Sequence, residues 1–179
     1  KKEKEYGHPI YILTDEPYRE LVYTDAEVPY IPAIYDHTLM AYSWSKSLSL
    51  PGERIGYVAI PDEIDDSAQF IDAAIIANRV CGDTNAPSFM QLVVERCMDA
   101  RVDVPYYEKN AKDLYKMVTD AGFEAVLPQG AFYLWVKSPD PDESKLVAAA
   151  KEERILLVPG SAFAGPGYVR LSFCVSNEM

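Results

Sequence analysis

The sequence predicts an α/β fold, and two observations on its apolar residues support this prediction. Up to residue 60, short apolar runs alternate with turn signals, a pattern that is typical of buried strands. Beyond residue 61 the hydrophobic period changes from two residues to about 3.6, which indicates helices. From residue 131 onward both patterns are interleaved, so a smaller α+β unit is expected to follow the first.

Three short strands are expected in the first half of the chain, over residues 9–13, 38–44 and 55–60. The first is expected to be buried, and it ends at a turn signal, residues 14–17, that contains Asp, Glu and Pro. Pro61 closes the third strand, because proline cannot donate a hydrogen bond to a continuing ladder.

Two helices are expected after these strands. Asp62 is the expected N-cap of the first helix, which runs towards Asn78. The core face of this helix is expected to contain Ile64, Ile71 and Ile75. The second helix starts at residues 85–87, where a proline early in the first turn costs no hydrogen bond. Its expected apolar positions are Phe89, Leu92, Val93 and Cys97.

A third helix is expected after Pro105, with a long apolar stripe along one face. The stripe consists of Tyr107, Ala111, Leu114, Val118 and Ala121. Gly122 is the natural C′ residue that ends this helix, because glycine adopts the left-handed conformation readily. A domain boundary is expected near residues 100–104, which gives domains of residues 1–103 and 104–179.

The rest of the chain has the pattern of a small α+β domain. A strand is expected over residues 131–137, and a helix from Asp140 to Arg154. Two further strands are expected over residues 155–158 and 168–174.

The composition excludes several classes of partner. The 179 residues include 17 Lys and Arg against 28 Asp and Glu, a formal net charge of −11 at pH 7. Such a chain has no basic field to attract phosphate backbones, so neither nucleic acid nor an anionic membrane surface is an expected partner. The longest apolar runs reach about five residues, too short to span a membrane.

Cysteine and histidine usage indicates neither a disulfide framework nor a metal site. Three cysteines, Cys81, Cys97 and Cys174, are odd in number and far apart, which suits a reducing cytoplasm. The two histidines, His8 and His37, stand beside no nucleophile motif. Neither a Ser-His-Asp triad nor a bound metal is therefore expected.

The densest group of polar residues lies between residues 43 and 57. Ser43, Ser45 and Arg54 supply hydroxyls and a guanidinium, the donor set that a phosphate dianion prefers. Lys46 can form a Schiff base with an aldehyde when burial and neighbouring cations keep its amine unprotonated. An aldehyde and a phosphate on one small molecule describe pyridoxal 5′-phosphate. The alternative interpretation is a solvated polar turn between two strands.

A second polar group follows the first expected strand. Asp15 and Tyr18 stand at the carboxyl end of that strand, where open α/β sheets bind ligands. A carboxylate there can keep a pyridine nitrogen protonated, which turns the ring into an electron sink. The phenol can donate a hydrogen bond to the 3-oxygen of the ring. Taken alone, Asp15 would instead be interpreted as a helix cap or an Asx-turn.

Four motifs, in this order, resemble the class I and II aminotransferases of pyridoxal-phosphate fold type I, the aspartate-aminotransferase-like enzymes. They are Asp-Glu-Pro-Tyr at residues 15–18, Ser-x-Ser-Lys at residues 43–46 with Arg54 eight residues on, Gln-Gly-Ala-Phe-Tyr at residues 129–133, and Tyr-Val-Arg-Leu-Ser at residues 168–172. The resemblance runs from end to end of the chain. It implies the C-terminal portion of the large-domain sheet together with the small α+β C-terminal domain.

The resemblance assigns three catalytic roles. Lys46 is similar to the lysine that binds the cofactor aldehyde and moves the substrate's α-proton. Asp15 matches the partner of the pyridine nitrogen, and Tyr18 matches the phenol on the 3-oxygen.

It also assigns binding roles. The residues that match ligands of the cofactor phosphate are Ser43, Ser45 and Arg54. Arg170 matches the arginine that binds the substrate α-carboxylate, although a salt-bridged arginine on a strand is the alternative, and Gly130 lies in a turn that approaches the substrate. Arg79 stands near the position where dicarboxylate-specific members bind a distal carboxylate, but the spacing does not align, and a solvated arginine at a helix end is favoured.

The implied reaction transfers an amino group between an α-amino acid and a 2-oxo acid. Members of the family are considerably longer, and the part before residue 15 that completes their cofactor site is absent, so we expect a fragment with little activity alone. A half-sheet exposes an unpaired edge and apolar faces, so self-association or a homodimer is expected. Two alternatives stay open: a carbon–sulfur lyase of the same fold, and a non-catalytic aminotransferase-like module.

Overall fold

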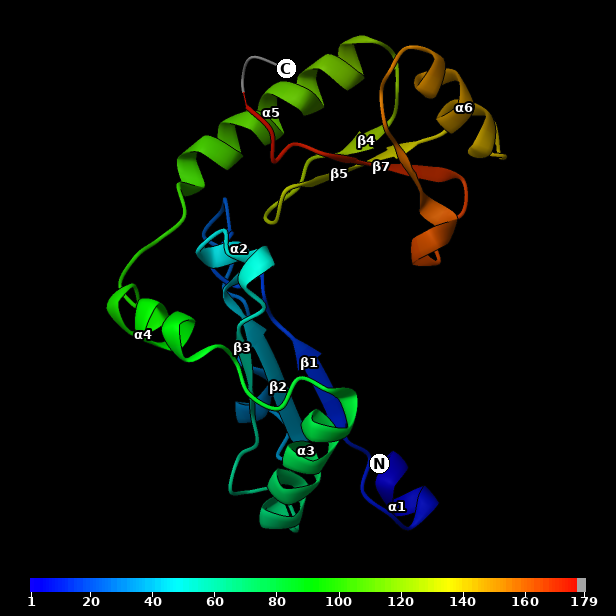
Figure 1. Ribbon diagram of the computed structural model, residues 1–179. Helices are drawn as coiled ribbons and strands as arrows, with labels where there is room; N and C mark the ends of the chain where they lie inside the picture. The colour runs from blue at the N-terminus through cyan, green and yellow to red at the C-terminus, as the bar shows by residue number, and fades with distance from the viewer. Residues whose placement is uncertain (177–179) are drawn as a thin grey trace. The chain divides into compact units, whose positions relative to one another are not determined.

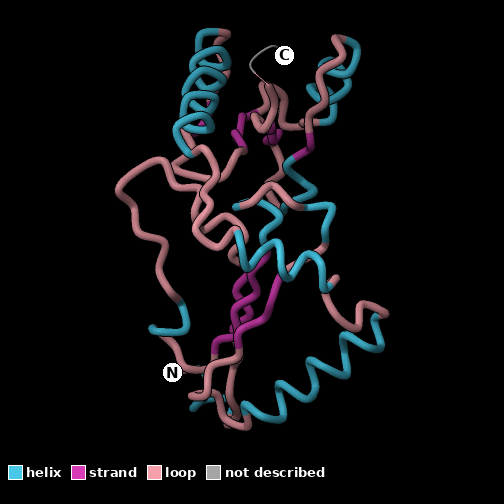
Figure 2. The backbone as a smooth tube through the Cα atoms, turned by 60° about the vertical axis from the view of Figure 1, so that its left-hand side comes forward, coloured by secondary structure: helices cyan, strands magenta, loops and turns pink. Residues whose placement is uncertain are grey.

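The computed structural model describes residues 1–176, which form two units (Figure 1). The first unit contains Lys1–Glu20 and Glu27–Val102. The second unit contains Leu21–Ala26 and the chain from Asp103 onward. The two units carry separate sheets, seen as separate groups of strands in Figure 2.

The sheet of the first unit has three strands in the order β1-β2-β3. They are β1 (Ile12–Asp15), β2 (Thr38–Ser43) and β3 (Gly56–Ala59). β2 lies in the middle, parallel to β1 and antiparallel to β3. The sequence therefore predicted all three strands, although β1 begins three residues later and ends two residues later than expected.

The first strand is exposed, which corrects the expectation of a buried one. The side chain of Leu13 is 68% exposed, and that of Ile12 is also exposed. Within the part of the chain that the structure describes, β1 pairs only with β2. An apolar run therefore does not by itself ensure that a strand is buried.

The helices of the first unit include one that begins later than the sequence predicts. They are α1 (Lys2–Tyr6), α2 (Trp44–Ser47), α3 (Ser67–Cys81) and α4 (Ser88–Arg96), with 3-10 turns η1 (Ile31–Ala33) and η2 (Pro51–Glu53). Asp62 is not an N-cap, because Asp66 has a left-handed backbone (φ 60°) that no continuous helix can contain. The expected core residue Ile64 is indeed buried, but in the turn before α3.

The buried face of α4 also differs from the prediction. Phe89 and Leu92 are exposed, whereas Met90 and Val94 pack with Ile55 in the core of the first unit. Both sets have helical spacing, so the period alone could not choose between the two faces.

The second unit packs helix α5 (Val104–Asp120) on a four-stranded antiparallel sheet, in the order β4-β5-β7-β6. Its other elements are β4 (Ala125–Val126), β5 (Tyr133–Lys137), α6 (Ser144–Glu152), β6 (Val158–Pro159), η3 (Gly160–Phe163) and β7 (Tyr168–Ser172). Ala111 is buried on α5, and Gly122 has φ 88° just beyond the C-cap, so both predictions are confirmed. The core of this sheet includes Leu134 and Val169, which are fully buried.

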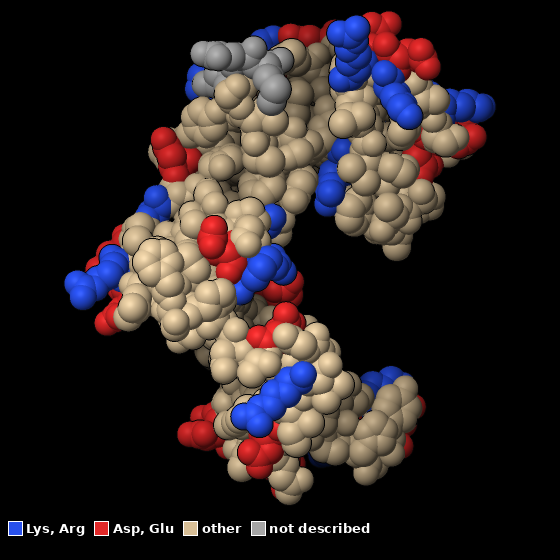
Figure 3. All heavy atoms as spheres, viewed as in Figure 1, with Lys and Arg blue, Asp and Glu red and all other residues tan. Residues whose placement is uncertain are grey.

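Charged side chains are spread over the surface of the described residues. On the face drawn in Figure 3, lysines and arginines are interspersed with aspartates and glutamates. The described residues contain no helix with the length and apolar character needed to cross a bilayer.

Candidate active site

The carboxyl end of the first sheet brings predicted site residues onto one face. Asp15 lies opposite Ala41 in the β1–β2 register, and Ser43 lies opposite Gly56 in the β2–β3 register. Because side chains alternate along a strand, Ala41 and Ser43 share a face, and their partners share it with them. Asp15 is exposed and stands beside a row of small residues, which leaves room for a flat ligand.

Gly56 is required in this row. A Cβ at this position would lie 2.5 Å from the carbonyl oxygen of Tyr42 and 3.0 Å from the Cβ of Ser43. The absence of a side chain here keeps the floor of the face shallow and lets β3 approach β2 closely.

Lys46 lies on α2, the short helix that begins directly after β2. Ser43 has an extended backbone and occupies the N-cap position, so the strand changes to helix at this residue. The Nζ atom of Lys46 lies 5.5 Å from the centre of the Tyr18 ring. The predicted nucleophile and the predicted phenol are therefore neighbours, although β1 and α2 are well separated in sequence.

The predicted phosphate ligands follow the same strand. Ser43 Oγ donates a hydrogen bond to Ser45 Oγ at 3.0 Å. Arg54 has a left-handed backbone (φ 50°, ψ 55°), and its Nη1 donates to the carbonyl oxygen of Pro51 at 2.8 Å. A cavity of about 410 Å³ opens beside Arg54 and Gly56, and its other lining residues are Asn78, Gly82, Asp83, Asn85, Ala86 and Pro87.

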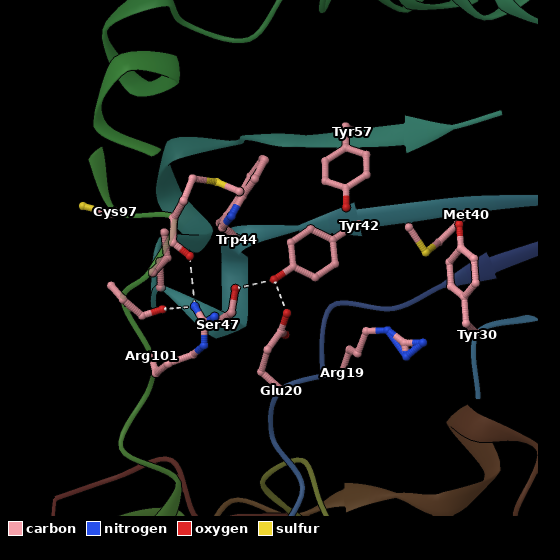
Figure 4. A pocket seen from close by; sticks show the side chains of 13 residues that line it. Arg19, Glu20, Tyr30, Met40, Tyr42, Trp44, Ser47, Tyr57, Cys97 and Arg101 are labelled. Carbon is pink, nitrogen blue, oxygen red and sulfur yellow. Dashed lines mark hydrogen bonds between the residues drawn. The ribbon is translucent and has the colours of Figure 1, made fainter. Parts of the chain in front are cut away.

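A second cavity of about 320 Å³ is lined by Met40 and Tyr42, which lie on the opposite face of β2 (Figure 4). There the hydroxyl of Tyr42 donates to Glu20 Oε1 and is hydrogen-bonded to Ser47 Oγ, each at 2.8 Å. Burial raises the pKa of Tyr42 to about 12, with a further contribution from the hydrogen bond to Glu20. Sequence reasoning missed this chain of groups. The alternation of residues along β2 was the available signal, since it puts Tyr42 on the face away from Ser43.

Arg170 lies on β7 in the second unit, opposite Trp135 of β5. Its guanidinium carbon is 4.1 Å from the centre of the Tyr133 ring and 4.0 Å from the centre of the Phe163 ring. The predicted strand position is confirmed, but the aromatic neighbours were not predicted. Among residues 1–176, no ion pair of Arg170 is found.

Gly130 lies in the turn that enters β5, as predicted. A Cβ here would lie 2.4 Å from the carbonyl oxygen of Leu21, because Val22 forms an isolated antiparallel bridge with Gly130. The neighbouring Ala131 has a left-handed backbone (φ 57°), and its carbonyl accepts a hydrogen bond from the hydroxyl of Tyr23. Burial raises the pKa of Tyr23.

The predicted residues thus fall into two groups. Six of them lie in the first unit, namely Asp15, Tyr18, Ser43, Ser45, Lys46 and Arg54, and two lie in the second, namely Gly130 and Arg170. Arg79 is exposed in the last turn of α3. Among the described residues, no group of three His, Cys, Asp or Glu side chains is arranged to hold a metal ion, and the three cysteines are free.

Comparison with known proteins gives one consistent family. The family profile described as aminotransferase class I and II matches residues 4–179. The aspartate aminotransferase of Thermotoga maritima is 31% identical over 170 residues, covering 94% of this chain and 44% of that protein. The probable N-acetyl-LL-diaminopimelate aminotransferase of Bacillus subtilis is 32% identical over 178 residues, covering 96% and 44%.

Solved structures show the same relationship. A crystal structure of an amino transferase from Eubacterium rectale superposes with a TM-score of 0.93 at 46% identity, over 99% of this chain and 44% of that one. The aspartate aminotransferase of Thermotoga maritima superposes with a TM-score of 0.79 at 29% identity, over 99% and 46%. The chain therefore spans less than half the length of these relatives.

Proposed function

The chain belongs to the class I and II aminotransferases, and from this premise we propose that its residues serve amino-group transfer between an α-amino acid and a 2-oxo acid, with pyridoxal 5′-phosphate as cofactor. The two units are part of the fold type I architecture of that family. The observation that supports the proposal most is the row of small residues beside Asp15, with Lys46 following on α2.

The residues present fit this cofactor. The face formed by Ala41, Ser43 and Gly56 is shallow enough for a flat pyridine ring, and a Cβ at Gly56 would crowd it. Asp15 at one end of the row is an exposed carboxylate, which matches a ring nitrogen that must stay protonated. The paired hydroxyls near Arg54 match a phosphate.

Phosphate binding falls to Ser43, Ser45 and Arg54. The hydroxyls of Ser43 and Ser45 lie 3.0 Å apart, so both can donate to one dianion. The guanidinium of Arg54 adds charge and a bidentate donor edge, which a lysine would supply only as a point charge. The cavity beside Arg54 and Gly56 provides the space.

Proton handling falls to Asp15, Tyr18 and Lys46. When bound, pyridoxal 5′-phosphate supplies a ring that accepts the electron pair left at the substrate α-carbon. With the cofactor bound, Asp15 would hold the proton at the ring nitrogen, and Tyr18 would donate a hydrogen bond to the 3-oxygen. With the cofactor bound, the amine of Lys46 would carry the proton from the substrate α-carbon to C4′ of the cofactor. Arg170 binds the substrate α-carboxylate, a planar anion that suits its guanidinium.

The experiment that tests this function is an absorption spectrum of the protein with added pyridoxal phosphate, followed by borohydride reduction and peptide mapping. We expect a visible band and a reduced adduct on Lys46, since its amine lies beside Tyr18. Lys46→Arg keeps the charge but removes the nucleophile, so it should lose both signals. Lys116→Arg, an exposed position on α5, is the matched control and should retain them.

Two outcomes would contradict the proposal. The first is a label spread over surface lysines with Lys46 unmodified. The second is a wild-type spectrum that equals that of Lys46→Arg. Pyruvate and ammonia formed from an amino acid without any 2-oxo-acid acceptor would instead identify a carbon–sulfur lyase acting through the same residues.

The isolated chain is expected to turn over slowly. Its described residues offer two hydroxyls and one guanidinium to the phosphate, which is a partial donor set for a dianion. The three free cysteines suit a reducing compartment, and we place the protein in the cytoplasm.

A further inference from the structure

The guanidinium of Arg170 lies close to two aromatic rings. Its Cζ atom lies 4.1 Å from the ring centre of Tyr133 and 4.0 Å from that of Phe163, both close for cation–π contacts. Both rings belong to the second unit. A guanidinium held this close to two rings can still donate its N–H groups to a ligand.

The loop that carries Phe163 is fixed by a buried carboxylate. Glu143, at the start of α6, accepts hydrogen bonds from the backbone N–H of Ser161 at 3.1 Å and of Gly167 at 2.9 Å. These bonds tie together the two ends of the loop that contains η3. Gly160 leaves no space for a side chain, since a Cβ there would lie 2.1 Å from the carbonyl oxygen of Gly165.

The turn that leads to Tyr133 is fixed from a different part of the chain. Ala131 N–H donates to the carbonyl oxygen of Leu21 at 2.9 Å, and Tyr23 N–H donates to that of Gln129 at 2.8 Å. The hydroxyl of Tyr23 also donates to the carbonyl of Ala131, which holds that residue in its left-handed conformation. Both rings beside Arg170 are thus supported by hydrogen bonds that do not involve Arg170.

We propose that Phe163 and Tyr133 are positioning residues that clamp Arg170 edge-on to a substrate carboxylate, and that Glu143 acts through Phe163. The two rings keep water from the faces of the guanidinium and restrict its rotation. Two parallel N–H donors then bind a planar carboxylate, and little side-chain conformational entropy is lost on binding because the guanidinium is already oriented. This inference rests on the proposed function, because it takes Arg170 as the carboxylate-binding residue.

The test is a titration of the protein, labelled with ¹⁵N-arginine, with pyruvate as the carboxylate probe. The Nε–H signal of Arg170 is identified by its loss in Arg170→Lys. We expect that signal to carry a ring-current shift in the free protein and to move on addition of pyruvate. Phe163→Leu should remove the part of the ring-current shift that comes from Phe163, with the Tyr133 part retained, and should weaken pyruvate binding by about three- to thirty-fold.

Matched variants distinguish a loss of Arg170 positioning from a general loss of structure. Phe163→Tyr keeps a ring and should restore both the shift and the affinity, whereas Phe89→Leu, at an exposed position of the first unit, should change neither. Glu143→Gln should reproduce part of the Phe163→Leu effect, because an amide offers only one oxygen to two N–H donors. Glu124→Gln, at an exposed ion pair with Lys137, is its control.

The outcomes distinguish failure of this inference from failure of the proposed function. A wild-type signal that does not respond to pyruvate would contradict the role of Arg170 in the proposed function. A response with equal dissociation constants for wild type and Phe163→Leu would overturn the clamp alone. Tyr133→Leu gives an independent check, since it removes the other ring and leaves the loop of Phe163 intact.

Discussion

Arg54 combines a functional side chain with an unfavourable backbone. Its φ of 50° and ψ of 55° place it in the left-handed region, which costs an L-residue about 1 to 2 kcal/mol. This conformation turns the chain from η2 into β3, so that Gly56 comes to lie opposite Ser43. A glycine would suit the backbone better, and the presence of arginine is therefore consistent with a role for its guanidinium.

Two substitutions at this position separate strain from binding. Arg54→Gly is expected to be more stable than Arg54→Ala by about 1 kcal/mol, because only glycine avoids the strain. Both variants should bind pyridoxal phosphate equally weakly, since both lack the guanidinium. Urea unfolding and a cofactor titration measure the two effects.

Glu53 provides the control for this comparison. It directly precedes Arg54 but has no positive φ, so Glu53→Gly is expected to be less stable than Glu53→Ala. Equal stability of the two Arg54 variants would show that the turn relaxes and that no strain is stored there.

Functional residues that lie close together in the sequence were predictable. Residues whose hydrogen-bond partners lie far away in the sequence were not. The sequence predicts Ser43, Ser45 and Lys46 as site residues because they lie within one short motif. Glu143 reaches a backbone N–H 24 residues away, and Tyr23 reaches a carbonyl 108 residues away. No local pattern links such partners, because the fold alone brings them together.

At the scale of elements, α1 is attached to the first sheet through a single carboxylate oxygen. Glu3 Oε1 accepts hydrogen bonds from Tyr35 Oη at 2.6 Å and from the N–H of Ile10 at 2.9 Å, and it lies 2.8 Å from His37 Nδ1. The Tyr35 hydroxyl, then the Ile10 N–H, then His37 lower the pKa of Glu3 to about 2. The hydrogen bond to Glu3 in turn raises the pKa of His37, and Asp65 lies 3.5 Å from its Nε2.

This attachment should depend on pH in both directions. The Glu3 contribution to stability is present above its ordinary pKa of 4.5 and is lost as the pH falls towards about 2. The His37 contribution is present below its ordinary pKa of 6.5 and is lost as the pH rises through the raised value. The attachment is therefore strongest between these two ordinary values.

Glu3→Gln should lower the pKa of His37 towards its ordinary value, as followed by the NMR titration of its ring protons. Glu5→Gln removes a carboxylate from the same helix, one that pairs with the exposed Lys2, and should leave His37 unchanged. A His37 pKa that is equal in wild type and Glu3→Gln would contradict this account.

Element types were predictable and element ends less so. β2 and α5 were predicted closely because each has an unambiguous period and a clear terminator. The start of α3 was wrong because Asp66 adopts a left-handed conformation, which nothing in its composition indicates. The two-residue strands β4 and β6 gain their pairing from β5 and β7, so they have little periodic signal of their own.

At the scale of the whole molecule, the described residues expose many large apolar side chains. Val80 on α3 is 81% exposed, and helix α3 has no fully buried residue. Leu13 is exposed on β1, an edge strand that can pair with another chain. Exposed apolar side chains and an unpaired strand edge both favour association.

The chain is therefore expected to self-associate at micromolar concentration in sedimentation velocity. Leu13→Lys places a charge on the edge strand and should shift the distribution towards monomer. Leu156→Lys makes the same substitution at an exposed position outside the sheets and should leave the distribution unchanged. A monodisperse wild-type monomer would contradict the expectation.

The segment Leu21–Ala26 has a consequence for the order in which the chain folds. It belongs to the second unit, yet its partners at Gln129 and Ala131 follow about a hundred residues later. At ordinary rates of synthesis that interval lasts roughly 5 to 20 seconds. The pairing of β1 with β2 requires only residues up to 43, so it can form on the ribosome before Ala131 is made. The hydroxyl of Tyr23 then still lacks its acceptor, the carbonyl oxygen of Ala131. The second unit closes only after residue 131 has been made, although Leu21–Ala26 are made about a hundred residues earlier.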